Sequence, residues 1–263
     1  AARVRRGIQV LYGAVTGAPP ASPAPTCHWF GGSGLLAYYP FDKGNATDAF
    51  GSNDGSAYRG YHISTHLRVV DGKDGGDAGR LVSAGDYVTL PYALTDGAIT
   101  GDKARTICLW AQVEDWEEDD VLFQYGSDSS ATSTFSLTLG RQEGQLVVDN
   151  ATITVTGSNM AWDYWHHYCV TYDQLNVTFY FDGVAGATWR SSLNTGTETG
   201  VSLGSQQGGD YGLQGALDEV YLYDTALDSH AINVLYGSVT EAPTASPAPT
   251  SHWSEGSGPW AYS

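Results

Sequence analysis

The sequence has few basic residues: 12 Lys and Arg stand against 29 Asp and Glu in 263 residues, a formal net charge of −17. Nucleic-acid binding depends on cationic side chains that displace counterions from phosphates, so the composition argues against a nucleic-acid partner. Attraction to anionic membrane surfaces is disfavoured for the same reason. No apolar run approaches the roughly 18 residues that span a bilayer, so we expect no membrane insertion. The acidic surface suits Ca²⁺, or it serves only to keep the chain soluble.

Cysteine is also scarce, with three in the chain. Cys108 and Cys169 lie within strand-like segments, and a disulfide between them would close a loop of about 60 residues, which the loop-entropy relation equates with about 4 kcal/mol. Two separate buried thiols are the alternative. Cys27 lies outside these segments, and its pairing stays open.

The two ends of the chain repeat each other. Residues 8–39 align without a gap on residues 232–263, and 22 of the 32 positions are identical. A repeat of this quality indicates tandem organisation. The sequence therefore predicts one complete module at 34–237, with the tail of a preceding repeat at 1–13 and the start of a following repeat at 258–263.

Two Pro-rich linkers, 14–33 and 238–257, join the module to its predicted neighbours. Proline fixes φ and removes the amide donor, which favours an extended spacer over a flexible tether. Trp29 and Trp253 occupy equivalent positions in the two linkers. Because an exposed Trp contributes nothing to a solvated tether, we expect both to dock on domain surfaces as inter-module contacts. A Trp that covers only its own linker is the alternative.

Inside the module, short segments alternate between apolar and polar residues, and turn residues separate them. This pattern predicts the antiparallel strands of a sandwich. Asp182-Gly183 predicts a type I′ hairpin turn, because both central positions need φ > 0. Residues 228–237 have helical spacing. The strand-like segments are 86–91, 105–113, 120–126, 134–140, 145–157, 166–173, 176–184, 201–205 and 215–224.

Five sequence blocks, which reach in order from Gly34 to Gly237, carry a family resemblance. They are GLLAYYPFDKGNATDAFGSNDGSA (34–57), GDYVTLP (85–91), TICLWAQV (106–113), WHHYCVTYD…NVTFYFDGV (165–184) and GALDEVYLYDTALDSHAINVLYG (215–237). Together they resemble the laminin-G-like, concanavalin A-like jelly-roll family. The resemblance implies an all-β fold of two packed antiparallel sheets, each of six or seven strands, with one short C-terminal helix.

The resemblance also implies a structural Ca²⁺ site, since family members often carry Ca²⁺ at the sandwich edge. The opening loop is rich in Asp and Asn, and the family places it near the closing strand. Asp42, Asp48 and Asp218 are the predicted ligands. Asx turns, in which such side chains cap their own backbone, are the alternative.

Three N-x-S/T sequons, at Asn45, Asn150 and Asn176, lie at predicted turns or strand ends. A glycan at such a place projects into water. The linkers, rich in Ser, Thr and Pro, resemble glycosylated stalks. These features predict a secreted, surface-exposed glycoprotein.

The sequence contains no clear pattern of catalytic residues. The acidic run 114–120 lacks the Glu-x-Asp-x-x-Glu spacing of jelly-roll glucanases, because Trp116 occupies the middle position. His166 and His167 cannot chelate one ion together, since adjacent strand residues point to opposite faces. We therefore expect no enzymatic activity.

The leading functional prediction is a structural module of an extracellular filament, coat or matrix, whose partners are neighbouring modules of the same chain or homopolymer. The alternative is a calcium-dependent glycan-binding module of a surface adhesin. Its sugar platform would come from aromatic residues in loop-like contexts: Trp116, Trp162, Tyr164, Trp189 and Tyr211.

Overall fold

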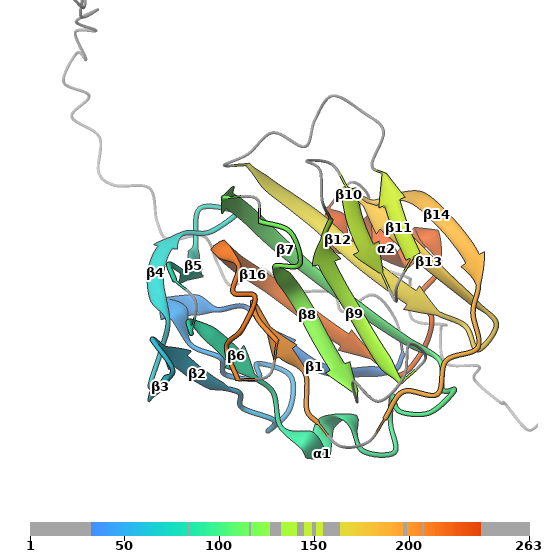
Figure 1. The fold of residues 1–263 in the computed structure, drawn as a ribbon, viewed down its shortest axis with the longest axis horizontal. Helices are drawn as coiled ribbons and strands as arrows, with labels where there is room; N and C mark the ends of the chain where they lie inside the picture. Colours follow the sequence, from blue (N-terminus) through green and yellow to red (C-terminus); the bar gives the residue numbers. More distant parts are fainter. Residues whose placement is uncertain are drawn as a thin grey trace, which may run out of the picture.

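The computed structural model describes residues 33–237, apart from 84, 116, 127–132, 141–144, 149–150, 155–163, 197–198 and 207, and apart from the side chains of 145, 147 and 151–154. Within these ranges the chain folds into two antiparallel sheets of eight strands each, which pack against each other as a sandwich (Figure 1). The predicted all-β class and sandwich architecture are confirmed. Each sheet has more strands than the six or seven expected, because short strands extend the edges.

The first sheet has the order β14-β13-β12-β7-β16-β5-β4, and β1 also pairs with β16. Its strands are β1 (Leu35–Tyr39), β4 (Arg68–Asp71), β5 (Asp77–Leu81), β7 (Arg105–Asp115), β12 (Trp165–Tyr172), β13 (Asn176–Phe181), β14 (Val184–Arg190) and β16 (Gln214–Tyr223). The β13–β14 turn has φ of 47° at Asp182 and 78° at Gly183, which confirms the predicted hairpin.

The second sheet has the order β11-β10-β9-β8-β15-β6-β2-β3. Its strands are β2 (Ser56–Arg59), β3 (His62–Ser64), β6 (Tyr87–Thr89), β8 (Val121–Gly126), β9 (Thr134–Leu139), β10 (Gln145–Val148), β11 (Ala151–Thr154) and β15 (Ser202–Leu203). Segment 145–157, read above as one strand, instead contains the paired strands β10 and β11. The sequence between them is Asp149-Asn150, a pair that favours turns.

The main core fills the space between the sheets, where alternate residues of each strand point inward. In β7, Ile107, Leu109 and Ala111 belong to this core, yet the intervening residues are buried too. Helix α2 (Ser229–Tyr236) explains this, because it covers the outer face of the first sheet. It buries Ile232 and Leu235 there in a second cluster. A strand enclosed on both faces loses the alternation of exposed and buried residues.

Helix α2 is bounded as the sequence predicts. The Asp228 side chain accepts a hydrogen bond from the Ala231 amide at 2.9 Å, and Gly237 ends the helix with φ of 86°. These are a standard N-cap and a left-handed C-terminal residue. The other helical segments are η1 (Asp42–Gly44) and α1 (Tyr92–Thr95). In the described part of the chain, no helix has the length and apolarity needed to cross a membrane.

Candidate functional site

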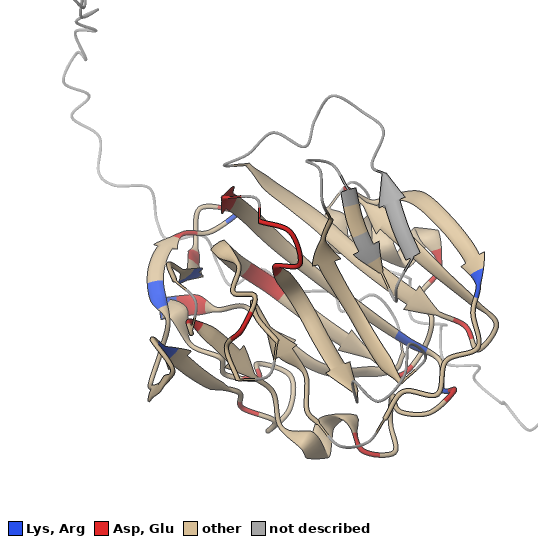
Figure 2. Cartoon of the chain, in the orientation of Figure 1, with Lys and Arg blue, Asp and Glu red and all other residues tan. Residues whose placement is uncertain are grey.

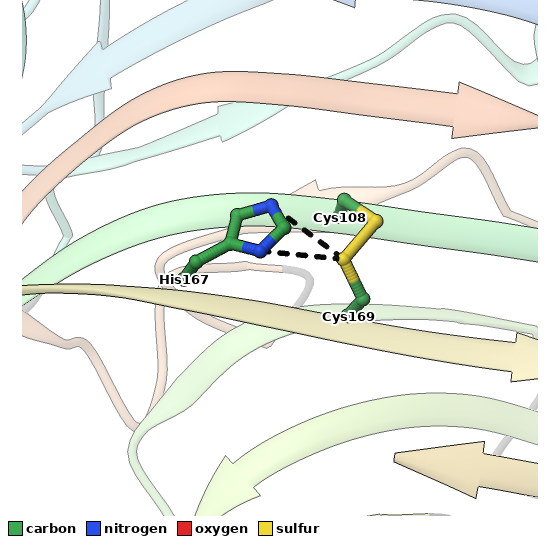
Figure 3. A group of neighbouring side chains, drawn as sticks. All are labelled: Cys108, His167 and Cys169. Atoms are coloured by element: carbon green, nitrogen blue, oxygen red, sulfur yellow. Dashed lines mark hydrogen bonds between the residues drawn. A yellow bond between two sulfur atoms is a disulfide. The ribbon is translucent and has the colours of Figure 1, made fainter. Parts of the chain in front are cut away.

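The structure joins Cys108 and Cys169 by a disulfide (Figure 3). The two residues face each other directly in the β7–β12 ladder and lie in the cluster beneath α2. The bond links positions 61 residues apart. It therefore ties two central strands of the first sheet on the face that the helix covers.

His167 lies against this disulfide, with Nε2 3.6 Å from the Cys169 Sγ, and its ring packs on Trp110 (Figure 3). Burial lowers the pKa of His167 to about 3, so the ring is neutral at physiological pH. Among the described residues, Cys108, His167 and Cys169 are the one trio whose ligand atoms lie within 4.8 Å of one another. Since the two sulfurs are bonded to each other, the trio serves packing and is no metal centre.

His166 points to the other side of β12, as the alternation of a strand predicts. Its Nδ1 lies 2.9 Å from the Asp182 Oδ2, and its ring packs on Phe181. The two adjacent histidines therefore belong to different clusters.

Asp48 is buried in the loop after β1 and serves that loop. Its Oδ1 accepts the amides of Tyr38 and Phe50, at 3.1 and 3.0 Å, and its Oδ2 accepts the amide of Asn53 at 3.1 Å. Burial raises the pKa of this carboxyl, but the donated backbone hydrogen bonds outweigh it and leave the pKa below its ordinary value. This is the geometry of the Asx-turn alternative.

Asp218 and Asp42 lie on either side of the β4–β5 turn. Asp218 is 2% exposed, and its Oδ2 accepts the Lys73 amide at 3.0 Å. Its Oδ1 is buried and has no hydrogen-bond partner among the described residues. Burial raises the pKa of Asp218 to about 7, and Glu219 and Asp74 add to the rise. Asp42 is exposed at the start of η1.

Asp74, in the same turn, is an acidic neighbour that sequence reasoning missed. A Cβ on Gly76 would lie 3.2 Å from the Asp74 Oδ1 and 3.9 Å from the Asp42 Oδ1, so both carboxylates border that glycine. The Oδ1 of Asp218, which has no hydrogen-bond donor among the described residues, is a suitable ligand for a divalent cation, because a bound cation can take the place of that donor at a buried carboxylate. No three acidic side chains of the described residues place ligand atoms within 4.8 Å of one another. The site is therefore not a preformed cage of Asp42, Asp48 and Asp218.

The acidic run between β7 and β8 is exposed from Glu117 to Asp119, and Figure 2 shows red along the loop that leads into β8. Asp120 departs from the expected solvated loop, because it is 5% exposed. Its Oδ2 has no hydrogen-bond partner among the described residues. Burial raises its pKa to about 7, with further contributions from Glu117, Asp115 and Asp119. Trp116 lies outside the described residues.

Two of the three sequons are described. Asn45 is half-buried directly after η1. Asn176 opens β13, and its Nδ2 donates to the Asp173 Oδ2 at 3.1 Å. Asn150 lies outside the described residues, as do Trp29, Trp253, most of the linker 14–33, the linker 238–257 and the repeat ends 1–13 and 258–263.

The predicted aromatic platform is dispersed. Tyr164 and Tyr211 are 65% and 50% exposed, whereas Trp189 packs against the main core. Trp162 is outside the described residues. Tyr61, which sequence reasoning missed, is 53% exposed in the turn between β2 and β3.

The two sheets and the short covering helix define a jelly-roll sandwich. A family model described as the concanavalin A-like lectin/glucanases superfamily, of laminin G type, matches residues 82–233, more than half of the chain. The chain belongs to this superfamily. No curated protein matches the sequence.

Several solved structures share the fold. Domain 4 of AbnA, a GH43 extracellular arabinanase from Geobacillus stearothermophilus solved with arabinotriose, aligns with a TM-score of 0.57 and 22% identity over 77% of this chain and 98% of that domain. The binding domain of Paraclostridial Mosquitocidal Protein 1 aligns with a TM-score of 0.60 and 17% identity, over 78% of this chain and 52% of that one. A botulinum neurotoxin type C structure, described as interacting with two ganglioside molecules for cell entry, aligns with a TM-score of 0.54 and 12% identity. The alignment covers 79% of this chain and 52% of that one. The chain thus spans about half of the toxin chains.

Proposed function

We propose that the chain is a non-catalytic structural module of a secreted, glycosylated tandem-repeat protein that builds an extracellular filament, coat or matrix. The observation that carries the proposal is the agreement between the internal repeat and the elements of the fold. The repeated sequence includes residues 232–236, the end of α2, and residues 35–39, which are β1. The last and the first elements of the module are therefore the parts that recur.

The buried side chains of α2 recur as well. Ile232 and Leu235 are packed under the helix, and the equivalent positions, 224 residues earlier, are Ile8 and Leu11. A second copy of the helix would thus have the same apolar face. This supports a preceding module with its own α2.

A two-repeat chain tests the proposal. We expect the distance between labels on successive modules to have a narrow distribution, because the Pro-rich linker stiffens the chain and Trp29 docks on a domain surface. Trp29→Ala should broaden that distribution, while Tyr92→Ala, an exposed aromatic change on α1, should not. An equally broad distribution in all three proteins would contradict the semi-rigid array.

The proposal includes a structural Ca²⁺ held by Asp218 and Asp42 together with carbonyls of the β4–β5 turn. Binding to the folded state alone stabilises by about 2.7 kcal/mol at a hundredfold excess over Kd. We expect chelation to lower Tm, and Asp218→Asn to abolish that response. Asp48→Asn, a matched change outside the turn, should lower stability yet keep the response to Ca²⁺. Identical melting curves in Ca²⁺ and in chelator would remove the ion from the proposal.

A second candidate function is calcium-dependent glycan binding by a surface adhesin. It is favoured by exposed aromatic side chains, Tyr61, Tyr164 and Tyr211, and by the complex of the related AbnA domain with arabinotriose. A glycan array on the isolated module, with and without chelator, separates the two functions. Tight binding that chelation abolishes favours the lectin, and the absence of binding leaves the structural role alone.

A further inference from the structure

At one end of the sandwich, a stretch of this acidic chain has basic residues and no acidic ones. Residues 55–70 include Arg59, His62, His66 and Arg68 but neither Asp nor Glu. In the fold they form β2, β3 and the start of β4. Figure 2 shows blue segments on β2 and β4 at this end of the sandwich. The local charge is thus opposite in sign to that of the whole chain.

This stretch borders a pocket at the edge of the sandwich. β3 is the last strand of one sheet and β4 the last strand of the other. The pocket at this edge has a volume of about 390 Å³, and its lining includes Arg59, His62, Ser64, Arg68, Ser83 and Asp86. That volume falls within the range of small-ligand sites, roughly 300–1,000 Å³.

Asp86 positions Arg68 at the pocket. Asp86 is 1% exposed, and its Oδ2 accepts a hydrogen bond from Arg68 Nη1 at 2.6 Å. Its Oδ1 accepts the Gly60 amide at 2.8 Å, which fixes the β2–β3 turn as well. The Arg68 side chain stays 43% exposed. Its guanidinium has five donors in a planar fork, so one carboxylate can orient it while other donors face the pocket.

Tyr61 adds a fixed aromatic ring in the β2–β3 turn, between Gly60 and His62, which both line the pocket. Gly60 and Tyr61 have φ of 56° and 65°, and a residue other than glycine in this region costs of order 1–3 kcal/mol. The Tyr61 amide donates to the Gly85 carbonyl at 2.9 Å. A Cβ on Gly85 or Gly209 would lie 2.6 or 2.7 Å from Tyr61 ring atoms. The ring therefore lies against two glycines, and half of its surface remains exposed.

We infer that this edge pocket binds an anionic sugar, in which a carboxylate or sulfate group contacts Arg59 and Arg68 while the sugar ring stacks on Tyr61. Guanidinium groups pair well with carboxylate and sulfate oxygens, and aromatic faces accept the apolar side of a sugar ring. Ile63, which lines the pocket and is 73% exposed, adds apolar surface. The site deepens the glycan-binding function proposed above and rests on it.

Isothermal titration of the full chain with three hexasaccharides tests the site: a uronic-acid chain, a sulfated chain and a neutral chain. We expect one or both anionic sugars to bind more tightly than the neutral one, and to bind more weakly as salt rises. The two anionic arms distinguish a uronate from a sulfate ester as the source of the charge. Equal affinity for all three sugars would overturn the inference.

Single variants then locate the binding. Arg59→Ala and Tyr61→Ala should each weaken anionic-sugar binding about tenfold, which corresponds to about 1.4 kcal/mol. Arg190→Ala, at the end of the opposite edge strand β14, should leave it unchanged. Arg68→Lys complements these variants, because it keeps a cation beside Asp86 while removing the fork. A melting curve for each variant verifies folding.

The outcomes separate the site from the function. If the module binds sugars and neither Arg59→Ala nor Tyr61→Ala weakens binding, the glycan-binding function stands and the edge pocket is wrong. If no sugar of any charge binds, both fail. If Arg59→Ala and Arg190→Ala weaken binding equally, the attraction reflects charge in general, and the pocket is again wrong.

Discussion

Arg105 tests whether a buried cation that donates to neutral oxygens stabilises this fold. It lies at the start of β7 with no exposed surface. Among the described residues, its guanidinium donates to neutral oxygens: the carbonyls of Ile99, Gly101 and Lys103, the Tyr125 hydroxyl and the Thr195 hydroxyl, at 2.5–2.9 Å. Its Cζ lies 5.3 Å from the Phe135 ring centre. One side chain thus joins the two sheets and two loops.

We expect Arg105→Met to lower the free energy of unfolding by about 3–5 kcal/mol. Methionine fills a similar volume, so little cavity forms. Several buried oxygens lose their donor, and each unsatisfied polar group costs about 1–3 kcal/mol before relaxation. Removing a desolvated charge offsets part of this loss. The expected net loss is a large fraction of the 5–15 kcal/mol that is typical of folded domains.

Urea unfolding at neutral pH measures this loss, with the slope m as a check for two-state behaviour. Tyr125→Phe is the matched control, because it removes one hydroxyl, which accepts from Arg105 and donates to the Ile99 carbonyl, and should cost about 1 kcal/mol. In the double variant the two losses should be less than additive, since both act on one network. Arg105→Met with the stability of the wild-type chain would refute the reasoning and show that the desolvation cost cancels the hydrogen bonds.

Three further predictions follow from the same structure. Burial raises the pKa of Asp120 to about 7 from an ordinary value of 3.8, so its contribution to stability is fullest below pH 4 and is lost as pH rises to 7. Asp120→Asn should therefore raise Tm at pH 8 but not at pH 4. Parallel pH profiles of Tm for the two proteins would contradict this. Replacing Cys108 and Cys169 by Ala should cost about 4 kcal/mol on the loop-entropy relation, and an unchanged urea midpoint would contradict it. Native material should carry glycans at Asn45 and Asn176, and an intact mass equal to the bare polypeptide would exclude them.

The positions of strands can be predicted from this sequence where one face of the strand is buried and the other is closer to solvent. β9 alternates regularly between half-buried and buried residues, and its range was predicted within one residue. The strands at the sandwich edge were harder to predict. β3 and β4 are mostly exposed, so their residues show no alternation. Their existence depends on pairing with β2 and β5, which is a property of the tertiary structure.

The candidate sites show a similar limit. Asp48 and Asp218 are chemically identical, and only the fold reveals that amides surround the first while one oxygen of the second has no donor. The sequence pattern placed Asp86 only at the start of a predicted strand. Its hydrogen bond to Arg68 could not be predicted from that pattern, because the two residues are 18 positions apart. Residues 55–70 lack acidic side chains, but residues 1–41 lack them too, so this signal alone does not single out the edge pocket.

The placement of β1 and α2 has a mechanical consequence. Both lie on the same sheet, since β1 pairs with β16 and Leu35 packs in the cluster beneath α2. Tension applied between Gly34 and Gly237 therefore loads β1 at one end and α2 at the other, where Ile232, Leu235 and the Tyr236 ring hold the helix on the sheet. Release of the helix would free the stretch from Asp228 to Gly237, roughly 33 Å when extended, while Thr106 still holds Thr225 and Leu227 by hydrogen bonds. The Cys108–Cys169 bond beneath the helix would keep β7 and β12 together, so the chain would lengthen in one short step while the sandwich stays closed.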